Sequence, residues 1–133
     1  MFVVLDTHVL IWLDQDDSSL GVEARKCADL ALRQGKLAVS AISFWETAML
    51  VTKGRVTIEL PVSAWRRDLL GLGLLEIPID GDIGITAAQL VLHGDPADRL
   101  IVATAQVKGA VLLTADHQLL QWESALERID ARR

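Results

Sequence analysis

Short apolar runs alternate with amphipathic stretches along the whole chain. Val, Ile and Leu dominate the apolar runs, which end at polar or turn-forming residues as buried strands do. Between the runs, apolar residues recur at the spacing of a helix that covers a core. Strands that alternate with helices indicate an α/β fold with a parallel sheet. The predicted strands span residues 2–5, 37–40, 74–79, 110–114 and 126–129.

The pattern also predicts seven helices, several with start or stop signals. Ser18 or Ser19 is expected to cap the second helix, and Gly35 to end it. Asp95 and Pro96 suit the cap and first position of the sixth helix, which is apolar on nearly every side and therefore expected to be buried. The predicted helices span 7–13, 20–34, 43–53, 61–70, 83–92, 96–107 and 117–122, with residues 55–60 extended, a helix break at His93-Gly94 and loose ends around Arg132-Arg133.

Composition and charge suit one soluble domain. The 133 residues carry 13 Lys and Arg against 18 Asp and Glu, so the net charge of −5 does not advertise nucleic-acid binding. It does not exclude such binding, because acids that hold a divalent cation reverse the local sign. Cys27 is the single cysteine, read as a small buried hydrophobe; this excludes an intrachain disulfide and fits a cytoplasmic setting. No segment has the length and apolarity of a membrane span, so no membrane association is expected.

Four carboxylates stand at related places in this pattern. Asp6 and Asp116 directly follow predicted strands, Glu46 lies in the first turn of the helix after a strand, and Asp98 opens the apolar helix. The carboxyl ends of parallel strands meet at one edge of the sheet, which is where open α/β sheets bind ligands. We therefore expect the four acids to converge.

Each acid alone also has a purely structural interpretation. Asp6 and Asp116 could cap the helices that follow them, and Asp98 could favour the positive end of its helix. Glu46 and Ser43 have the S-x-x-E spacing of a capping box. Together, however, converging carboxylates repel one another and raise one another's pKa values. Hard oxygen ligands suit Mg²⁺ or Mn²⁺, and a site of this kind can cleave a phosphodiester.

Several polar residues adjoin the acids. Thr7, Ser43 and Thr114 could hydrogen-bond the carboxylates or a phosphate, although caps or core hydroxyls would explain them almost as well. Arg99 follows Asp98 and could contact phosphate or a neighbouring acid. The three histidines share no metal-ligand spacing, so a histidine metal site is not expected.

The order and spacing of four motifs carry a resemblance that covers essentially the whole chain. The segments LDTH at 5–8, SAISFWE at 40–46, DPADR at 95–99 and LTAD at 113–116 resemble the successive motifs of a PIN domain. They are most similar to the VapC toxins of VapBC toxin–antitoxin systems.

The resemblance implies a three-layer α/β/α sandwich around a mainly parallel sheet of about four to five strands, with residues 1–133 forming one PIN domain. It also implies a toxin with Mg²⁺- or Mn²⁺-dependent ribonuclease activity. By position, Asp6, Glu46, Asp98 and Asp116 resemble the family's catalytic and metal-binding acids, of which the last position is the most variable. Asp95 resembles only the capping residue before the third acid.

The apolar surplus bears on partners. Hydrophobic residues make up 51% of the chain, and with 9 Gly the share is about 58%, against a usual range of about 45–50% that counts glycine. Such a surplus predicts contiguous apolar surface, to which the four tryptophans, Trp12, Trp45, Trp65 and Trp122, could contribute. We expect a homodimer, as in similar toxins. We also expect a groove near helices 7–13, 43–53 and 61–70 for an amphipathic segment of a VapB-type antitoxin, giving a heterotetramer or larger.

Other classes share parts of the pattern. A phosphatase of the haloacid dehalogenase type needs a second acid where His8 stands, and a receiver domain needs a lysine after a late strand. A non-catalytic PIN-fold binding module would tolerate loss of the acids. All four acid positions are filled, which favours the enzyme. No aromatic and basic stripe selects one class of RNA.

Overall fold

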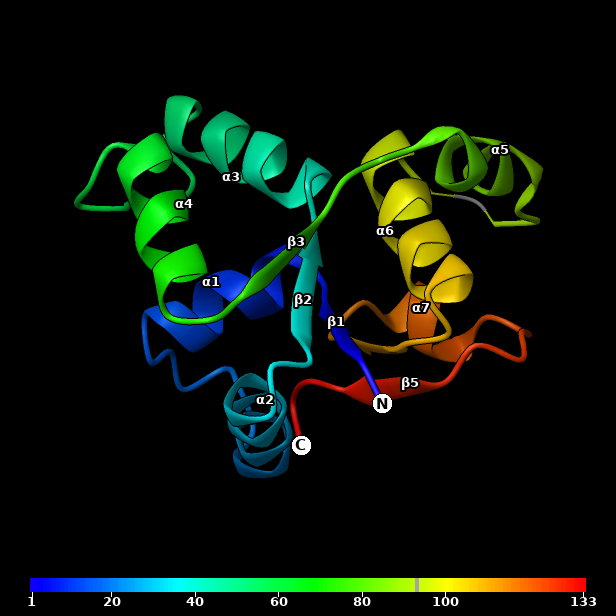
Figure 1. Ribbon diagram of the computed structural model, residues 1–133, viewed down its shortest axis with the longest axis horizontal. Helices are drawn as coiled ribbons and strands as arrows, with labels where there is room; N and C mark the ends of the chain where they lie inside the picture. The colour runs from blue at the N-terminus through cyan, green and yellow to red at the C-terminus, as the bar shows by residue number, and fades with distance from the viewer. Residues whose placement is uncertain (93) are drawn as a thin grey trace.

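The computed structural model describes residues 1–92 and 94–133, so the predicted break at His93 lies outside the described residues. Strands and helices follow one another in the predicted order (Figure 1). The strands are β1 (Val3–Leu5), β2 (Leu37–Ser40), β3 (Leu75–Ile77), β4 (Val111–Thr114) and β5 (Arg128–Asp130). The helices are α1 (Thr7–Asp14), α2 (Val22–Arg33), α3 (Ile42–Thr52), α4 (Val62–Gly71), α5 (Gly81–Gln89), α6 (Pro96–Val107) and α7 (His117–Gln121).

The five strands form one parallel sheet in the order β3-β2-β1-β4-β5. Leu5 of β1 lies opposite Val39 of β2 and Leu113 of β4, so all three side chains share one face. The chain builds outward from β1 in one direction and from β4 in the other, which makes the β1–β4 boundary the topological switch point. A receiver domain has the order 2-1-3-4-5, so the observed order excludes that alternative.

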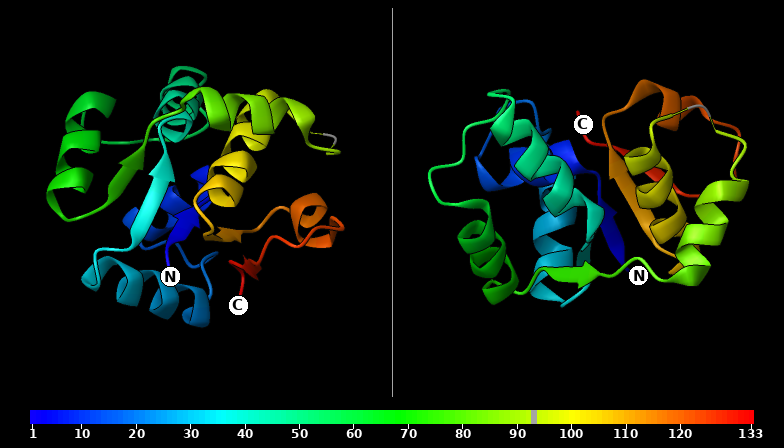
Figure 2. Two further views of the ribbon diagram at one scale, coloured as in Figure 1. Left: turned by 45° about the vertical axis from the view of Figure 1, so that its right-hand side comes forward. Right: turned by 90° about the horizontal axis from the view of Figure 1, so that it is seen from above.

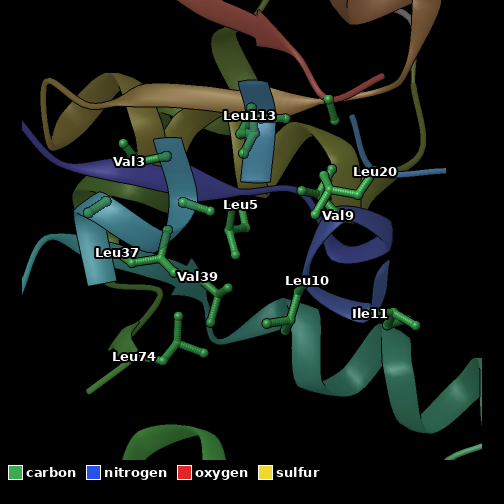
Figure 3. Packing of buried hydrophobic residues seen from close by; sticks show 14 of the residues in the cluster. Val3, Leu5, Val9, Leu10, Ile11, Leu20, Leu37, Val39, Leu74 and Leu113 are labelled. Atoms are coloured by element: carbon green, nitrogen blue, oxygen red, sulfur yellow. The ribbon is translucent and has the colours of Figure 1, made fainter. Parts of the chain in front are cut away.

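Helices cover both faces of the sheet (Figures 1 and 2). One face, which includes Val3, Leu5 and Val39, packs against apolar residues of α1, α2 and α4 (Figure 3). The other face, which includes Val4 and Leu112, packs against α6 and α7. α5 lies outside α6, where its Ile83 and Ala87 meet Ala103. The three layers agree with the predicted α/β/α sandwich.

Residues 55–60, expected to be extended, lie in the connection between α3 and α4. Two predicted details of local structure are wrong. α2 begins at Val22 after Gly21, which caps it without a side-chain hydrogen bond, so Ser18 and Ser19 do not cap this helix. The chain end is not loose, because residues 131–133 bond to the main chain around the start of α2.

The tryptophans are distributed unevenly between core and surface. Trp65 is buried and donates its Nε1–H to Asp14 Oδ2 at 2.8 Å. Trp12 and Trp122 are half-buried, whereas Trp45 on α3 is 55% exposed. Cys27 is half-buried against the core rather than fully enclosed. Among the described helices, none combines the length and apolarity needed to cross a membrane.

Candidate active site

Asp6 stands where β1 ends and α1 begins, at the switch point of the sheet. It is the N-cap of α1, and its Oδ1 accepts a hydrogen bond from the Thr7 N–H at 2.8 Å. Its Oδ2 accepts from Thr114 Oγ1, at the end of β4, at 2.7 Å. The predicted cap and the predicted contact with Thr114 are therefore both present. Both carboxylate oxygens are thus held in place, one by the start of α1 and the other by the end of β4.

Asp116 joins the same network through the hydroxyl group of Thr114. Its N–H donates to Thr114 Oγ1 at 3.1 Å, so one hydroxyl links Asp116 to Asp6. The Asp116 side chain caps α7: Oδ1 accepts from the Gln118 N–H at 2.8 Å and from the Leu119 N–H at 3.4 Å. Asp116 therefore caps α7 and belongs to the acid cluster at the same time.

Glu46 reaches the cluster from α3. Thr7 Oγ1 donates to Glu46 Oε1 at 2.6 Å and lies 3.0 Å from Ser43 Oγ. The predicted capping box is wrong, because α3 starts at Ile42 after Ala41, which places Ser43 inside the helix. Ser43 is fully buried and faces Thr7 rather than the free N–H groups of the helix start. Thr7 and Ser43 thus orient Glu46 toward the sheet edge.

Asp98 and Asp95 come from the first turn of α6. Asp95 is the N-cap, and its Oδ1 accepts the Asp98 N–H at 2.8 Å, as predicted. Carboxylate oxygens of Glu46, Asp95 and Asp98 all lie within 4.8 Å of one another. Asp95, expected to be a cap alone, is therefore also part of the acid cluster.

The acids line one cavity of about 370 Å³. Its wall contains five carboxylates together with Trp12, His8, Ala115 and Arg132. The carboxylates come from four places in the fold, namely the β1–α1 junction, α3, the start of α6 and the β4–α7 junction, and belong to Asp6, Glu46, Asp95, Asp98 and Asp116. All four acids singled out in the sequence therefore meet.

Burial and the repulsion between neighbouring charges shift the pKa values of Asp6, Glu46 and Asp98 upward. Burial is the main cause for Asp6, whose pKa is raised although the Thr114 hydroxyl and the Thr7 N–H oppose the shift. The pKa of Glu46 is raised chiefly by burial, against the Thr7 hydrogen bond. The pKa of Asp98 rises to about 7, first because of burial and then because Asp95, Asp6, Glu46 and Asp116 repel its charge. An elevated pKa in a cleft is typical of a functional site.

Arg99 does not join the cluster. Its guanidinium donates to the Leu92 carbonyl, to Leu90 O at 3.0 Å and to Ala88 O at 3.2 Å, at and just beyond the end of α5. Successive helical residues point about 100° apart, so a residue next to Asp98 in sequence faces a different neighbour. Arg99 thus holds α5 against α6, and within residues 1–92 and 94–133 it pairs with no acid.

Two features of the cavity were not found from the sequence. The spacing of Asp95 and Asp98, three residues apart at a helix start, could have indicated that both carboxylates share one side. Arg132 carries no such local signal, because its position depends on a contact between the chain end and residues about 110 positions earlier.

Comparison with known protein sequences shows the family. The profile of the PIN domain matches residues 3–123. This chain belongs to the PIN-domain family. Among its relatives is Ribonuclease VapC22 of Mycobacterium tuberculosis, which is 36% identical over 119 residues, covering 88% of each chain. That identity places this PIN-domain protein among the VapC ribonucleases.

Solved structures agree on the fold of this PIN domain. A chain in the crystal structure of VapBC2 from Rickettsia felis bound to a DNA fragment from their promoter superposes with a TM-score of 0.72 at 17% identity, covering 98% of both chains. A chain in DNA-bound VapBC from Salmonella typhimurium gives 0.64 at 17% identity, again with 98% of both chains covered. The toxin–antitoxin complex from Klebsiella pneumoniae gives 0.58 at 24% identity and 86% coverage of both.

Proposed function

We propose that this protein is a divalent-metal-dependent endoribonuclease and the toxin of a toxin–antitoxin pair. The observation that carries the proposal is the meeting of Asp6, Glu46, Asp98 and Asp116 in one cavity of a PIN domain. The 36% identity to a VapC ribonuclease supports RNA as the substrate. Since the proposed substrate is cellular RNA, we place the protein in the cytoplasm.

The donor set fits a hard divalent cation. Every candidate ligand is a carboxylate oxygen, the ligand type that Mg²⁺ and Mn²⁺ prefer. The raised pKa values of Asp6, Glu46 and Asp98 indicate negative charge that a cation would stabilise. We assign Asp6, Glu46, Asp98 and Asp116 as metal-binding and catalytic residues, with Asp95 beside them. A cation bound there would supply Lewis-acid activation and neutralise charge that develops at phosphorus.

The remaining residues of the site hold the acids in position. Thr114 ties Asp6 to the end of β4, and Thr7 ties Glu46 to the start of α1. Because these hydroxyls donate to carboxylate oxygens, they favour the ionised forms against the cost of burial. Ser43 backs Thr7 from a fully buried position. The strands and helices thus preorganise the acids before RNA binds.

Cleavage of RNA by the purified protein tests the nuclease. With Mg²⁺ or Mn²⁺ the parent should cut single-stranded RNA internally, and EDTA should stop the reaction. Asp98→Asn keeps the shape of the side chain and removes its charge, so it should fold and fail to cut. Asp29→Asn changes an exposed carboxylate on α2 and serves as the matched control. Cleavage by Asp98→Asn at the parent rate would reject the assignment.

Surface features support a protein partner. A cavity of about 570 Å³ lies between the end of α1, residues 57–60 and α4, and exposed Leu60 and Leu72 line it beside Asp14, Glu59 and Asp68. We propose that an apolar antitoxin segment with basic residues binds this groove. The sequence predicted a groove near α1, α3 and α4. The observed groove is lined by the end of α1, α4 and residues 57–60, and these residues take the place expected for α3.

A second apolar face lies on α3, where Trp45 and Met49 are exposed one turn apart. We assign this face to a homodimer. Co-expression with the product of the adjacent reading frame should yield a co-purifying complex that does not cut RNA. Light scattering of the toxin alone should give a dimer. A monomer that no neighbouring gene product inhibits would reject the toxin assignment while leaving the nuclease intact.

A further inference from the structure

The last three residues, 131–133, are fastened to the start of α2. Ala131 is fully buried; its N–H donates to Thr114 O at 2.8 Å, and its carbonyl accepts from the Gly21 N–H at 2.9 Å. The Glu23 N–H then donates to Arg133 O at 2.8 Å. Figures 1 and 2 show the chain end beside α2. A segment that follows the edge strand β5 is thus returned to the carboxyl end of β4.

Gly21 is what lets the segment approach so closely. A Cβ at position 21 would lie 1.9 Å from the Arg133 carbonyl carbon and 2.5 Å from the Arg132 carbonyl carbon and oxygen. All of these atoms are main chain, so no side-chain rotation could relieve the overlap. Glycine is therefore required here for the close backbone contact, and its φ of −70° is ordinary.

This fastening places the Arg132 side chain on the wall of the acid cavity. Its guanidinium donates from Nη1 to the Ala115 carbonyl, directly between Thr114 and Asp116 in the chain. Among residues 1–92 and 94–133, Arg132 forms no ion pair and its guanidinium has no other acceptor. Arg132 is the only Lys or Arg in the described lining of the cavity.

We propose that Arg132 binds a phosphate of the RNA backbone beside the bond that is cut. One N–H holds the guanidinium against Ala115, which leaves the other four donors of the planar group for a ligand. Arginine suits phosphate because two of its N–H groups can bond two phosphate oxygens at once. The proposal rests on the nuclease function above and adds to it a substrate-binding residue and the segment that positions it.

In the described part of the chain, Arg132 forms no ion pair with the carboxylates of the cavity. A guanidinium that served to neutralise them would lie within 4.0 Å of a carboxylate, and no such pair involves Arg132 in the described part of the chain. Its charge is therefore directed to the open cavity. There it offsets the repulsion that five carboxylates exert on an approaching polyanion.

Salt-dependent RNA binding separates this role from a structural one. Fluorescence anisotropy with a labelled oligouridine, in EDTA so that no cleavage occurs, gives Kd over a range of salt concentrations. Loss of one phosphate contact on a single strand lowers the slope of log Kd against log salt by about 0.7. We expect that reduction for Arg132→Gln. Arg133→Gln removes the same charge from the adjacent exposed residue, which does not line the cavity, and should leave the slope unchanged.

Gly21→Ala tests position apart from charge. It keeps Arg132 but displaces the segment that carries it, so it should reduce the slope as Arg132→Gln does. Parent and variants must show matching circular dichroism for the comparison. In Mg²⁺, Arg132→Gln should raise KM for RNA and retain a kcat close to that of the parent.

An unchanged slope for Arg132→Gln in a protein that cuts RNA would overturn the role of Arg132 alone. Equal reductions for Arg132→Gln and Arg133→Gln would also overturn it, because they would indicate general charge. A parent protein that neither binds nor cuts RNA would overturn the nuclease assignment and this inference with it.

Discussion

Replacing Asp98 by Asn should stabilise the metal-free protein at alkaline pH while abolishing RNA cleavage. The pKa of Asp98 in the folded protein is about 7, against an ordinary value of 3.8. The native state therefore binds this proton more tightly than the unfolded chain does. As pH rises from about 3.8 to about 7, the free energy of unfolding falls, and above that range the full destabilisation is present.

The magnitude follows from the size of the shift. A shift of about three pKa units corresponds to roughly 4 kcal/mol. The side chain is only half-buried, so solvent screening reduces this to about 2 kcal/mol. Asp98 also lies in the first turn of α6, where losing its charge forfeits about 0.5 kcal/mol. The expected net gain of Asp98→Asn is about 1.5 kcal/mol at pH 8 and close to zero at pH 4.

Urea unfolding in EDTA at the two pH values measures this difference. Asp29→Asn, on the exposed side of α2, should show no such pH-dependent gain. If Asp98→Asn were less stable than the parent at pH 8, or equally more stable at both pH values, burial and repulsion in the cavity would not explain the raised pKa of Asp98.

Three further results are expected. Mn²⁺ should raise the Tm of the parent in a thermal-shift assay. At a hundredfold excess over Kd the stabilisation corresponds to about 2.7 kcal/mol, and the Tm of Asp6→Asn should rise much less. Equal shifts of Tm for the parent and the variant would place the ion elsewhere. Mn²⁺ affinity measured by calorimetry should increase as pH rises through 7, because protons compete for Asp98 below its pKa of about 7; a flat profile would contradict this. Ser43→Ala should lower the free energy of unfolding by about 1 kcal/mol through its lost contact with Thr7, and RNA cleavage should persist because Thr7 still binds Glu46; complete loss of cleavage in a folded variant would contradict that reasoning.

Local pattern was enough to predict the strands, the helices and the convergence of four acids. Phe2 to Leu5 and Val111 to Thr114 are short apolar runs that end next to an acid, and parallel pairing brings such ends together. Asp95 and Pro96 began α6 as expected, because cap chemistry depends on adjacent residues. These features are local or follow from topology.

The errors concern residues whose partners lie in another element of the fold. Ser43 matches a capping motif, yet the core needs its hydroxyl beside Thr7, and α3 starts earlier. Arg99 adjoins an acid in sequence but turns to the carbonyls at the end of α5. The position of Arg132 depends on the close packing of the chain end against Gly21, which no local pattern indicates. Tertiary contacts decided all three.

In the proposed function, Asp6, Glu46, Asp98 and Asp116 form the metal centre at which RNA is cut. Crystals of protein that cuts RNA, soaked in Mn²⁺, would test it by anomalous scattering. We predict an anomalous peak in the acid cavity from an Mn²⁺ ion bonded to carboxylate oxygens of Glu46 and Asp98. This peak should be absent from Asp98→Asn crystals. If manganese bound elsewhere and the acid cavity stayed empty in active protein, these four acids would not be the metal centre.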